Sequence, residues 1–421
     1  MPHSASAHPS PKASGPEPAT GAVRLGRIRL RDFRNFERLE CELPAEGVMI
    51  LGPNGAGKTN LLEAVYYLEV FRSFRGASDR ELVRFGQEVF RVEATVEGPR
   101  GQRAIAAAYS AAERRKQVEV DRREVSRLSD AIGGLGAVVF SLEDVEIVRG
   151  SPSGRRRFMD ILLSLVEPGY VDALGKYRSV LSQRNEALKG GADRAQLEAW
   201  SAGLIEVGAR VMEARARWVA GRAAAFDRYH ARIAGGARGV LGYRPSVGTP
   251  EAGSEAPGPA RSETRVDGAS RDEAPAAGSP PSRAVWAETF RAALERARER
   301  ERRRGVTVVG PHRDELAFTA QVGGEEERDL RTYGSGGQQR TAALALRLAE
   351  ADTLRERLGR EPVYLLDDVF AELDRERSGR LLQLLEEGRS GQVVLTSPKP
   401  SEVRLRGGLD VWRLRDGRLE S

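Results

Sequence analysis

Short segments in which apolar and polar residues alternate fill the first third of the chain. They are residues 23–36 (VRLGRIRLRDFRNF), 89–98 (VFRVEATVEG), 103–110 (RAIAAAYS) and 116–125 (KQVEVDRREV). A period of two is typical of β-strands that bury one face. We therefore predict an antiparallel β layer in this part of the chain.

The period changes to that of a helix from about residue 153. Phe158, Ile161, Leu162 and Leu165 then fall on one helical face, and helix-forming Ala, Arg and Glu dominate residues 197–233 and 286–304. Strand patterns return after Gly305. They cover residues 306–310 (VTVVG), 316–320 (LAFTA) and 362–368 (PVYLLDD). A helical block is therefore expected to interrupt an α/β domain that both ends of the chain build.

Composition suggests where the domains begin and end. Residues 1–22 and about 249–283 are rich in Pro, Ser, Ala and Gly and offer little to bury, which predicts a disordered N-terminal extension and a flexible insertion. We predict an α/β head formed by residues 23–142 and 305–421. The mostly helical second lobe would span residues 143–304 and contain the insertion.

Charge and residue usage narrow the class of protein. The chain has 67 Lys and Arg against 61 Asp and Glu, a formal charge of +6, which favours polyanionic partners without naming one. Cys41 is the single cysteine, which excludes an internal disulfide and a cysteine-based metal site. No apolar run approaches the ~20 residues of a membrane-spanning helix, so we expect a cytoplasmic protein.

A phosphate-binding loop follows the apolar run at residues 47–51. The sequence GPNGAGKT matches G-x-x-x-x-G-K-[ST] and lies between a strand pattern and a helix pattern, the context that the motif requires. Backbone N–H groups and the helix N-terminus would hold the phosphates, Lys58 would reach the β- and γ-phosphates, and Thr59 would bind Mg²⁺. The predicted nucleotide-binding residues are Gly52, Pro53, Asn54, Gly55, Ala56, Gly57, Lys58, Thr59 and Asn60.

Two acids end a buried strand near the other end of the chain. Residues 363–366 are apolar, and Asp367 and Asp368 follow at the carboxyl edge, where ligands of parallel sheets bind. We expect Asp367 to bind Mg²⁺ and Asp368 to orient or deprotonate the attacking water. The alternative for either acid is a cap on the following turn.

A second anion-binding turn is predicted at Ser335, Gly336, Gly337 and Gln338, which open a long helix. The P-loop already accounts for the phosphates of one nucleotide, so this turn would serve a nucleotide held by another subunit. By itself, however, the same pattern is also that of an ordinary helix N-cap.

These motifs occur in the order found in ABC-type ATPase heads, and within that class the chain resembles the RecF family of bacterial recombination mediators. The resemblance covers roughly residues 24–420 apart from the insertion. Its markers are LRDFRNF, GPNGAGKTNLLEA, RSFR, FSLEDVEIVRGSPSGRRRFMD, VGPHRDEL, GSGGQQRT and LLDDVFAELD. It implies an ABC-type head, with a mixed sheet plus the antiparallel layer, interrupted by the helical lobe.

The resemblance also implies a mechanism. Two subunits would sandwich two ATP molecules, with Ser335 and Gly337 of one facing the γ-phosphate bound by Lys58 of the other and Asp374 near the interface. Such an ATP-dependent homodimer would bind double-stranded, gapped or junction DNA and act with RecR and RecO to direct RecA. Asp368 stands where ABC transporters usually have Glu, which suggests slow, DNA-stimulated ATP hydrolysis. The switch histidine of that class is absent from the strand that ends in Thr396 and Ser397.

Four further candidates keep two interpretations each. Arg34 and Asn35 would contact nucleotide or shape a β-turn. His312 is more often structural than catalytic in such a setting. The arginines Arg155–Arg157 lie at a predicted helix start, where the helix dipole disfavours cations, so either DNA phosphate or intramolecular acids would compensate them.

Three functions were weighed. The first is a DNA-repair ATPase whose ATP-driven dimerisation controls DNA binding. The second is an SMC-like structural chromosome ATPase, but the insert of some 150 residues lacks sustained heptads, so we expect a compact lobe. The third is a transporter ATPase, against which the large insert and the missing histidine count.

Overall fold

The computed structural model describes residues 23–98, 101–250, 280–322, 326–387, 391–398 and 408–420. The predicted N-terminal extension at 1–22 and most of the predicted insertion at 249–283 lie outside the described residues.

The elements follow the order in which the sequence patterns change. The strands are β1 (Arg24–Phe33), β2 (Phe36–Glu42), β3 (Gly47–Leu51), β4 (Val89–Gly98), β5 (Gly101–Ser110), β6 (Arg115–Val120), β7 (Arg123–Glu124), β8 (Ala137–Ser141), β9 (Gly239–Arg244), β10 (Glu315–Val322), β11 (Glu326–Asp329), β12 (Val363–Asp367), β13 (Val393–Ser397), β14 (Asp410–Arg415) and β15 (Arg418–Glu420). The helices are α1 (Lys58–Val70), α2 (Asp79–Leu82), α3 (Val145–Arg149), α4 (Pro152–Val166), α5 (Tyr170–Lys189), α6 (Arg194–Ala234), α7 (Arg283–Arg304), α8 (Leu330–Tyr333), α9 (Gly336–Leu358) and α10 (Arg375–Glu387).

A mixed sheet carries the nucleotide motifs. Its order is β15-β14-β3-β13-β12-β8, with every pair parallel except β14 and β15. All five residues of β3, β8, β12 and β13 are buried, as expected for strands covered on both faces. The register pairs Ser397 with Leu51 and Asp367 with both Thr396 and Ser141, so the carboxyl ends of these four strands share one edge.

The predicted antiparallel layer is confirmed. It has the order β2-β1-β4-β5-β6-β7, and its burial alternates along β4 as the period of two requires. Apolar side chains of this layer, including Phe33 and Phe90, pack with Leu62 and Tyr67 of α1 in one continuous core. The helix that follows the P-loop is therefore clamped between the two sheets.

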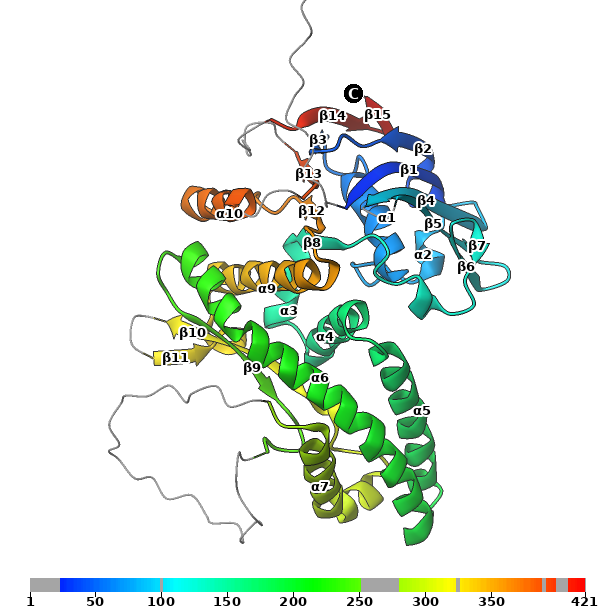
Figure 1. The fold of residues 1–421 in the computed structure, drawn as a ribbon, viewed down its shortest axis with the longest axis vertical. Helices are drawn as coiled ribbons and strands as arrows, with labels where there is room; N and C mark the ends of the chain where they lie inside the picture. Colours follow the sequence, from blue (N-terminus) through cyan, green and yellow to red (C-terminus); the bar gives the residue numbers. More distant parts are fainter. Residues whose placement is uncertain are drawn as a thin grey trace, which may run out of the picture.

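The helical block lies below both sheets in Figure 1, where α6 runs from the vicinity of α9 down to α7. Two cores hold it together. One joins α4 and α6 to β9, β10 and α9, and the other joins α5, α6 and α7 around Trp286 and Phe290. The three-stranded sheet β11-β10-β9 pairs residues 239–244 with residues 315–322, which come from the two sides of the boundary predicted at 304. The division into head and lobe stays a prediction.

One predicted strand is wrong. Residues 306–310 form bends and irregular backbone instead of a strand. The N–H of Thr307 donates to Asn185 Oδ1 at 2.7 Å and the N–H of Val308 donates to Glu301 Oε1 at 2.8 Å. Side chains of α5 and α7 therefore take the hydrogen bonds that a strand partner would have taken.

Helix α9 connects the two regions. Arg347, near its middle, is buried between Asp144 at 2.6 Å and Glu350 at 2.7 Å, and Asp144 in turn accepts a hydrogen bond from the N–H of Ser141 at the end of β8. Farther along, Trp218 and Tyr229 of α6 donate to Thr353 and Asp352 of α9. The helix that starts at the Ser-Gly-Gly-Gln turn is thus tied both to the sheet edge and to the lobe.

Candidate nucleotide-binding site

The P-loop connects β3 to α1 at the shared carboxyl edge of the sheet. Gly57 has φ 107°, and a Cβ there would lie 2.5 Å from the Asn35 amide nitrogen, so glycine is required. A Cβ on Gly52 would clash with the Leu414 carbonyl oxygen of β14. Lys58 is 5% exposed, and its ammonium group donates to the carbonyl oxygen of Gly52 at 2.9 Å, which keeps the cation over the loop.

The structure brings together the two predicted metal ligands, which are 308 residues apart in sequence. Thr59 Oγ1 donates to Asp367 Oδ1 at 3.0 Å. Hydroxyl and carboxylate oxygens are the hard ligands that Mg²⁺ prefers, and a Mg²⁺ site with two protein ligands takes its others from phosphates and water. The donor set therefore fits the cation named in the prediction.

A third hydroxyl at this edge was missed as a functional residue. Thr396, at the end of β13, donates to Asp367 Oδ1 at 2.9 Å and accepts from the N–H of Asp368 at 3.1 Å. It is 1% exposed. The sequence indicated a strand ending here, but only the register of β13 between β3 and β12 places Thr396 against both acids.

The two acids have different environments. Burial raises the pKa of Asp367, while hydrogen bonds from Thr396 and Thr59 counteract this effect. Asp368 is half-buried and has a left-handed backbone with φ 49°, a region that Asp tolerates better than most residues. The turn after β12 thus holds one carboxylate in the sheet edge and turns the next one away from it.

The turn between β1 and β2 supports the P-loop. Asn35 donates to the Ala56 carbonyl oxygen at 3.1 Å and accepts from the side chain of Asn60 at 2.8 Å. Arg34, with φ 55°, donates to both carboxylate oxygens of Glu63 at 2.8 and 2.9 Å. Asn35 is therefore in the P-loop environment, whereas the guanidinium of Arg34 is bound within the chain. Nucleotide contact by either residue stays a prediction.

The Ser-Gly-Gly-Gln turn has the geometry of a capping box. Gln338 N–H donates to Ser335 Oγ at 3.3 Å, and Ser335 N–H donates to Gln338 Oε1 at 2.8 Å. Two residues into the helix, Arg340 donates to the Glu372 carbonyl oxygen at 3.1 Å. The turn and the segment that contains Asp374 therefore lie side by side. Asp374 Oδ1 accepts from the N–H of Arg377 at 2.8 Å.

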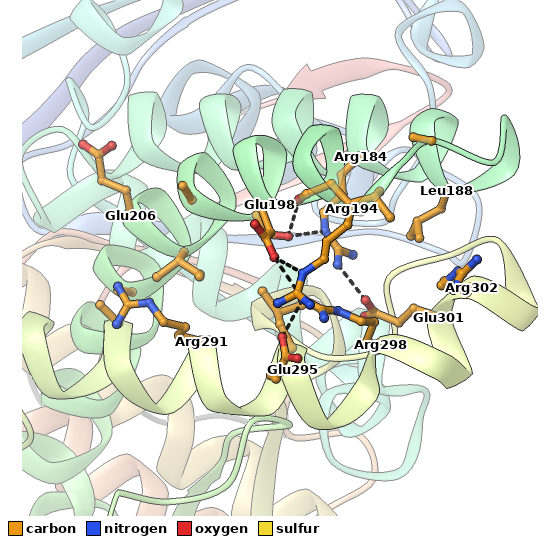
Figure 2. Close-up of a pocket in the computed structure, with 18 of the residues that line it drawn as sticks. Arg184, Leu188, Arg194, Glu198, Glu206, Arg291, Glu295, Arg298, Glu301 and Arg302 are labelled. Atoms are coloured by element: carbon orange, nitrogen blue, oxygen red, sulfur yellow. Dashed lines mark hydrogen bonds and ion pairs between the residues drawn. The ribbon is translucent and has the colours of Figure 1, made fainter.

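The largest cavity, about 1340 Å³, is far from these motifs in the fold. It lies between α6 and α7 in the lobe, with residues of α5 at one end. Figure 2 shows its acidic and basic side chains pairing with one another, as in Arg184 with Glu301 at 2.7 Å and Arg194 with Glu198 at 2.6 Å. Because its charges are satisfied internally, this groove is a poor candidate for the nucleotide phosphates.

The model of the RecF/RecN/SMC N-terminal domain matches residues 24–405. The chain is 34% identical to the DNA replication and repair protein RecF of Synechocystis sp. over 94% of this chain and 97% of that protein. The corresponding protein of Bacillus subtilis is also 34% identical, over 89% of this chain and 93% of the relative. The chain belongs to the RecF family.

Solved structures agree with this family membership. A structure of the recombination mediator protein RecF with ATP, in the RecFOR pathway, has a TM-score of 0.79 and 29% identity, covering 96% of this chain and 98% of that one. The SMC head domain of Pyrococcus furiosus, at 15% identity and a TM-score of 0.52, shows a shared fold alone. The predicted ABC-type head of the RecF family is therefore confirmed.

The weaker likeness to SMC heads has a counterpart in the lobe. Its longest helix, α6, packs along α5, α7 and α9 and does not project as an isolated hairpin (Figure 1). No described helix is long and apolar enough to cross a membrane.

Two uncertain candidates have structural partners. Arg155 is 2% exposed, pairs with Glu315, and donates to the carbonyl oxygens of Val148 at 3.0 Å and Gly150 at 2.9 Å, so intramolecular groups, and not DNA, compensate it. His312 contacts Tyr177 Oη through Nδ1 at 2.6 Å and the Thr307 carbonyl oxygen through Nε2 at 3.1 Å. Burial lowers the pKa of His312 to about 4.

Proposed function

We propose that this RecF-family protein is an ATP-dependent, DNA-binding recombination mediator of DNA repair and replication restart. ATP drives its dimerisation and its binding to duplex or gapped DNA, and slow hydrolysis reverses both. It acts with RecO and RecR to direct RecA loading, inside the cytoplasm. The observation that carries the proposal is the Thr59–Asp367–Thr396 cluster next to a buried P-loop lysine, within a chain whose relatives are named for replication and repair.

The residues divide the work by position. The P-loop N–H groups and Lys58 bind the phosphates, since the loop lies at the start of α1 where the helix dipole favours negative charge. Thr59 and Asp367 hold Mg²⁺, which neutralises charge on the phosphates when bound. Thr396 fixes the carboxylate of Asp367 and the backbone of Asp368 together, so that Asp368 is oriented toward the attacking water.

The second subunit completes the site. Ser335, Gly336, Gly337 and Gln338 form an exposed helix start, whose N-terminus suits an anion, and Asp374 lies beside it. Facing the γ-phosphate held by the partner, this turn would make dimerisation depend on ATP. Arg347 connects the same helix to the sheet edge, which supports coupling between nucleotide and interface.

A DNA mobility-shift experiment with ATP, with ADP and without nucleotide tests the function. We expect tight binding with ATP only, and Lys58→Ala should abolish the ATP effect while its melting temperature stays near that of wild type. Equal DNA affinity in all three conditions would refute the proposal.

A further inference from the structure

A second, smaller cavity lies where the start of α4 meets α5 and residues 311–313. Its volume is about 180 Å³, equivalent to some six water molecules at ~30 Å³ each. We call it the arginine pocket, since its polar lining includes Ser153, Arg156, Arg157, Arg178, Arg215 and His312.

The positive charges of the arginine pocket exceed its negative ones. Four arginines line it against one carboxylate, that of Asp160. Asp160 is shared, because Arg215 binds it at 2.8 Å and Arg178 binds it at 3.2 Å. Arg215 also lies 3.5 Å from Asp314 behind the pocket. The acids of this region are therefore already engaged by Arg178 and Arg215.

Arg156 and Arg157 have no ion pair within the part of the chain that the structure describes. Arg156 donates to the carbonyl oxygen of Asp314 at 2.9 Å, and Arg157 donates to that of Ser73 at 3.1 Å. Each interaction leaves most of the five N–H donors of a guanidinium unused. The large groove of Figure 2 differs, because its arginines pair with glutamates across the groove.

The local backbone adds to this imbalance. Helix α4 is 15 residues long, begins at Pro152 and has no acid in its first turn. Its N-terminus therefore favours an anion, yet the sequence places three arginines there. Arg155 is compensated by Glu315, and Arg156 and Arg157 are not. His312 is neutral near pH 7, because burial and the nearby arginines lower its pKa to about 4, so it can donate or accept a hydrogen bond without adding charge.

We infer that the arginine pocket binds a phosphate group, with Arg156 and Arg157 as its principal ligands, and that the DNA backbone supplies this phosphate. Guanidinium groups match phosphate oxygens in a planar, bidentate arrangement, which is why arginine is favoured at such sites. A backbone contact of this kind positions DNA without reading its sequence. The inference rests on the proposed function, since it takes DNA as the ligand.

Three variants test the pocket. Arg156→Ala combined with Arg157→Ala removes both principal ligands. Ser153→Asp places a negative charge in the pocket while improving the helix dipole, so it should weaken DNA binding and leave the melting temperature unchanged or higher. Arg303→Ala is the matched control: Arg303 is exposed on α7 in the same lobe and also donates to a backbone carbonyl, that of Glu299.

The readout is the affinity for a labelled duplex of about 30 base pairs with ATP, measured between about 50 and 200 mM salt. We expect the double variant to bind about tenfold more weakly, and the slope of log affinity against log salt to become shallower by about 1 to 2, near 0.9 per phosphate lost. Two duplexes of different sequence should lose affinity equally. Arg303→Ala should remain within about twofold of wild type.

Several outcomes would overturn the inference. One is wild-type affinity in both pocket variants, and another is an equal loss in Arg303→Ala, which would indicate total charge and not a site. If inorganic phosphate raises the melting temperature of wild type but not of the double variant while their DNA affinities agree, the pocket takes a free anion and not DNA. If wild type with ATP binds no DNA at all, the proposed function itself fails.

Discussion

Replacing Thr396 with Val tests how the sheet edge holds the two acids. Val keeps the shape of Thr but removes a hydroxyl that donates to Asp367 at 2.9 Å and accepts from the N–H of Asp368 at 3.1 Å. A hydrogen bond to a charged group contributes about 1.5–3 kcal/mol, and a buried N–H left without a partner costs about 1–3 kcal/mol. The two effects share one hydroxyl and are not additive, so we expect a loss of about 2–4 kcal/mol in the free energy of unfolding.

The same substitution should slow hydrolysis more than it weakens ATP binding. Thr396 contacts the acids and not the P-loop, so kcat should fall about tenfold or more, the factor that corresponds to ~1.4 kcal/mol, with KM for ATP nearly unchanged. Loss of this hydrogen bond should also raise the pKa of Asp367 further, since the bond now lowers it, and should move the acid limb of the kcat profile to higher pH.

Denaturant unfolding and steady-state ATP hydrolysis measure both effects. Thr396→Ser is the control: it keeps the hydroxyl and removes one methyl group, so its stability should stay within about 1 kcal/mol of wild type and its turnover should be near normal. A Val variant within ~0.5 kcal/mol of wild type and with unchanged kcat would refute the assigned role of Thr396.

Two further predictions concern buried charges. Burial raises the pKa of Glu69 from 4.5 to about 7, so its stabilising contribution is present below pH 4.5 and is lost as pH rises through 7; wild type should lose about 2 kcal/mol relative to Glu69→Gln between about pH 5.5 and 8.0 in denaturant unfolding, and parallel pH profiles would contradict this. Arg347→Ala leaves Asp144 and Glu350 buried without their cation and should cost about 3–5 kcal/mol, whereas Arg194→Ala, from an exposed pair, should cost at most about 1 kcal/mol; equal costs would show that burial of the Arg347 pairs is unimportant.

The sequence predicted those parts of the site that depend on local pattern. The P-loop and the Asp367–Asp368 pair each follow an apolar strand, and parallel strands bring their carboxyl ends to one edge, so their meeting could be expected. Thr396 was missed because its role depends on β13 lying between β3 and β12, a strand order that periodicity does not specify.

The same limit explains the other differences. Whether Arg155 meets DNA or an acid depends on Glu315, 160 residues away, and no local signal links the two. Residues 306–310 have the composition of a strand, but Asn185 and Glu301 bind their N–H groups first. Strand β9 was not predicted, because a short pattern such as GVLGYR becomes a strand only through its pairing with β10.

The most direct test of the central claim is the sedimentation mass of wild type and Ser335→Arg with ATP, with ADP and without nucleotide. Ser282→Arg, at the exposed N-cap of α7, controls for the loss of a helix-capping serine. The account predicts that ATP alone makes wild type and Ser282→Arg dimeric, while Ser335→Arg binds ATP and stays monomeric. Monomeric wild type with ATP bound, or a Ser335→Arg variant that dimerises normally, would contradict the cross-subunit ATP site.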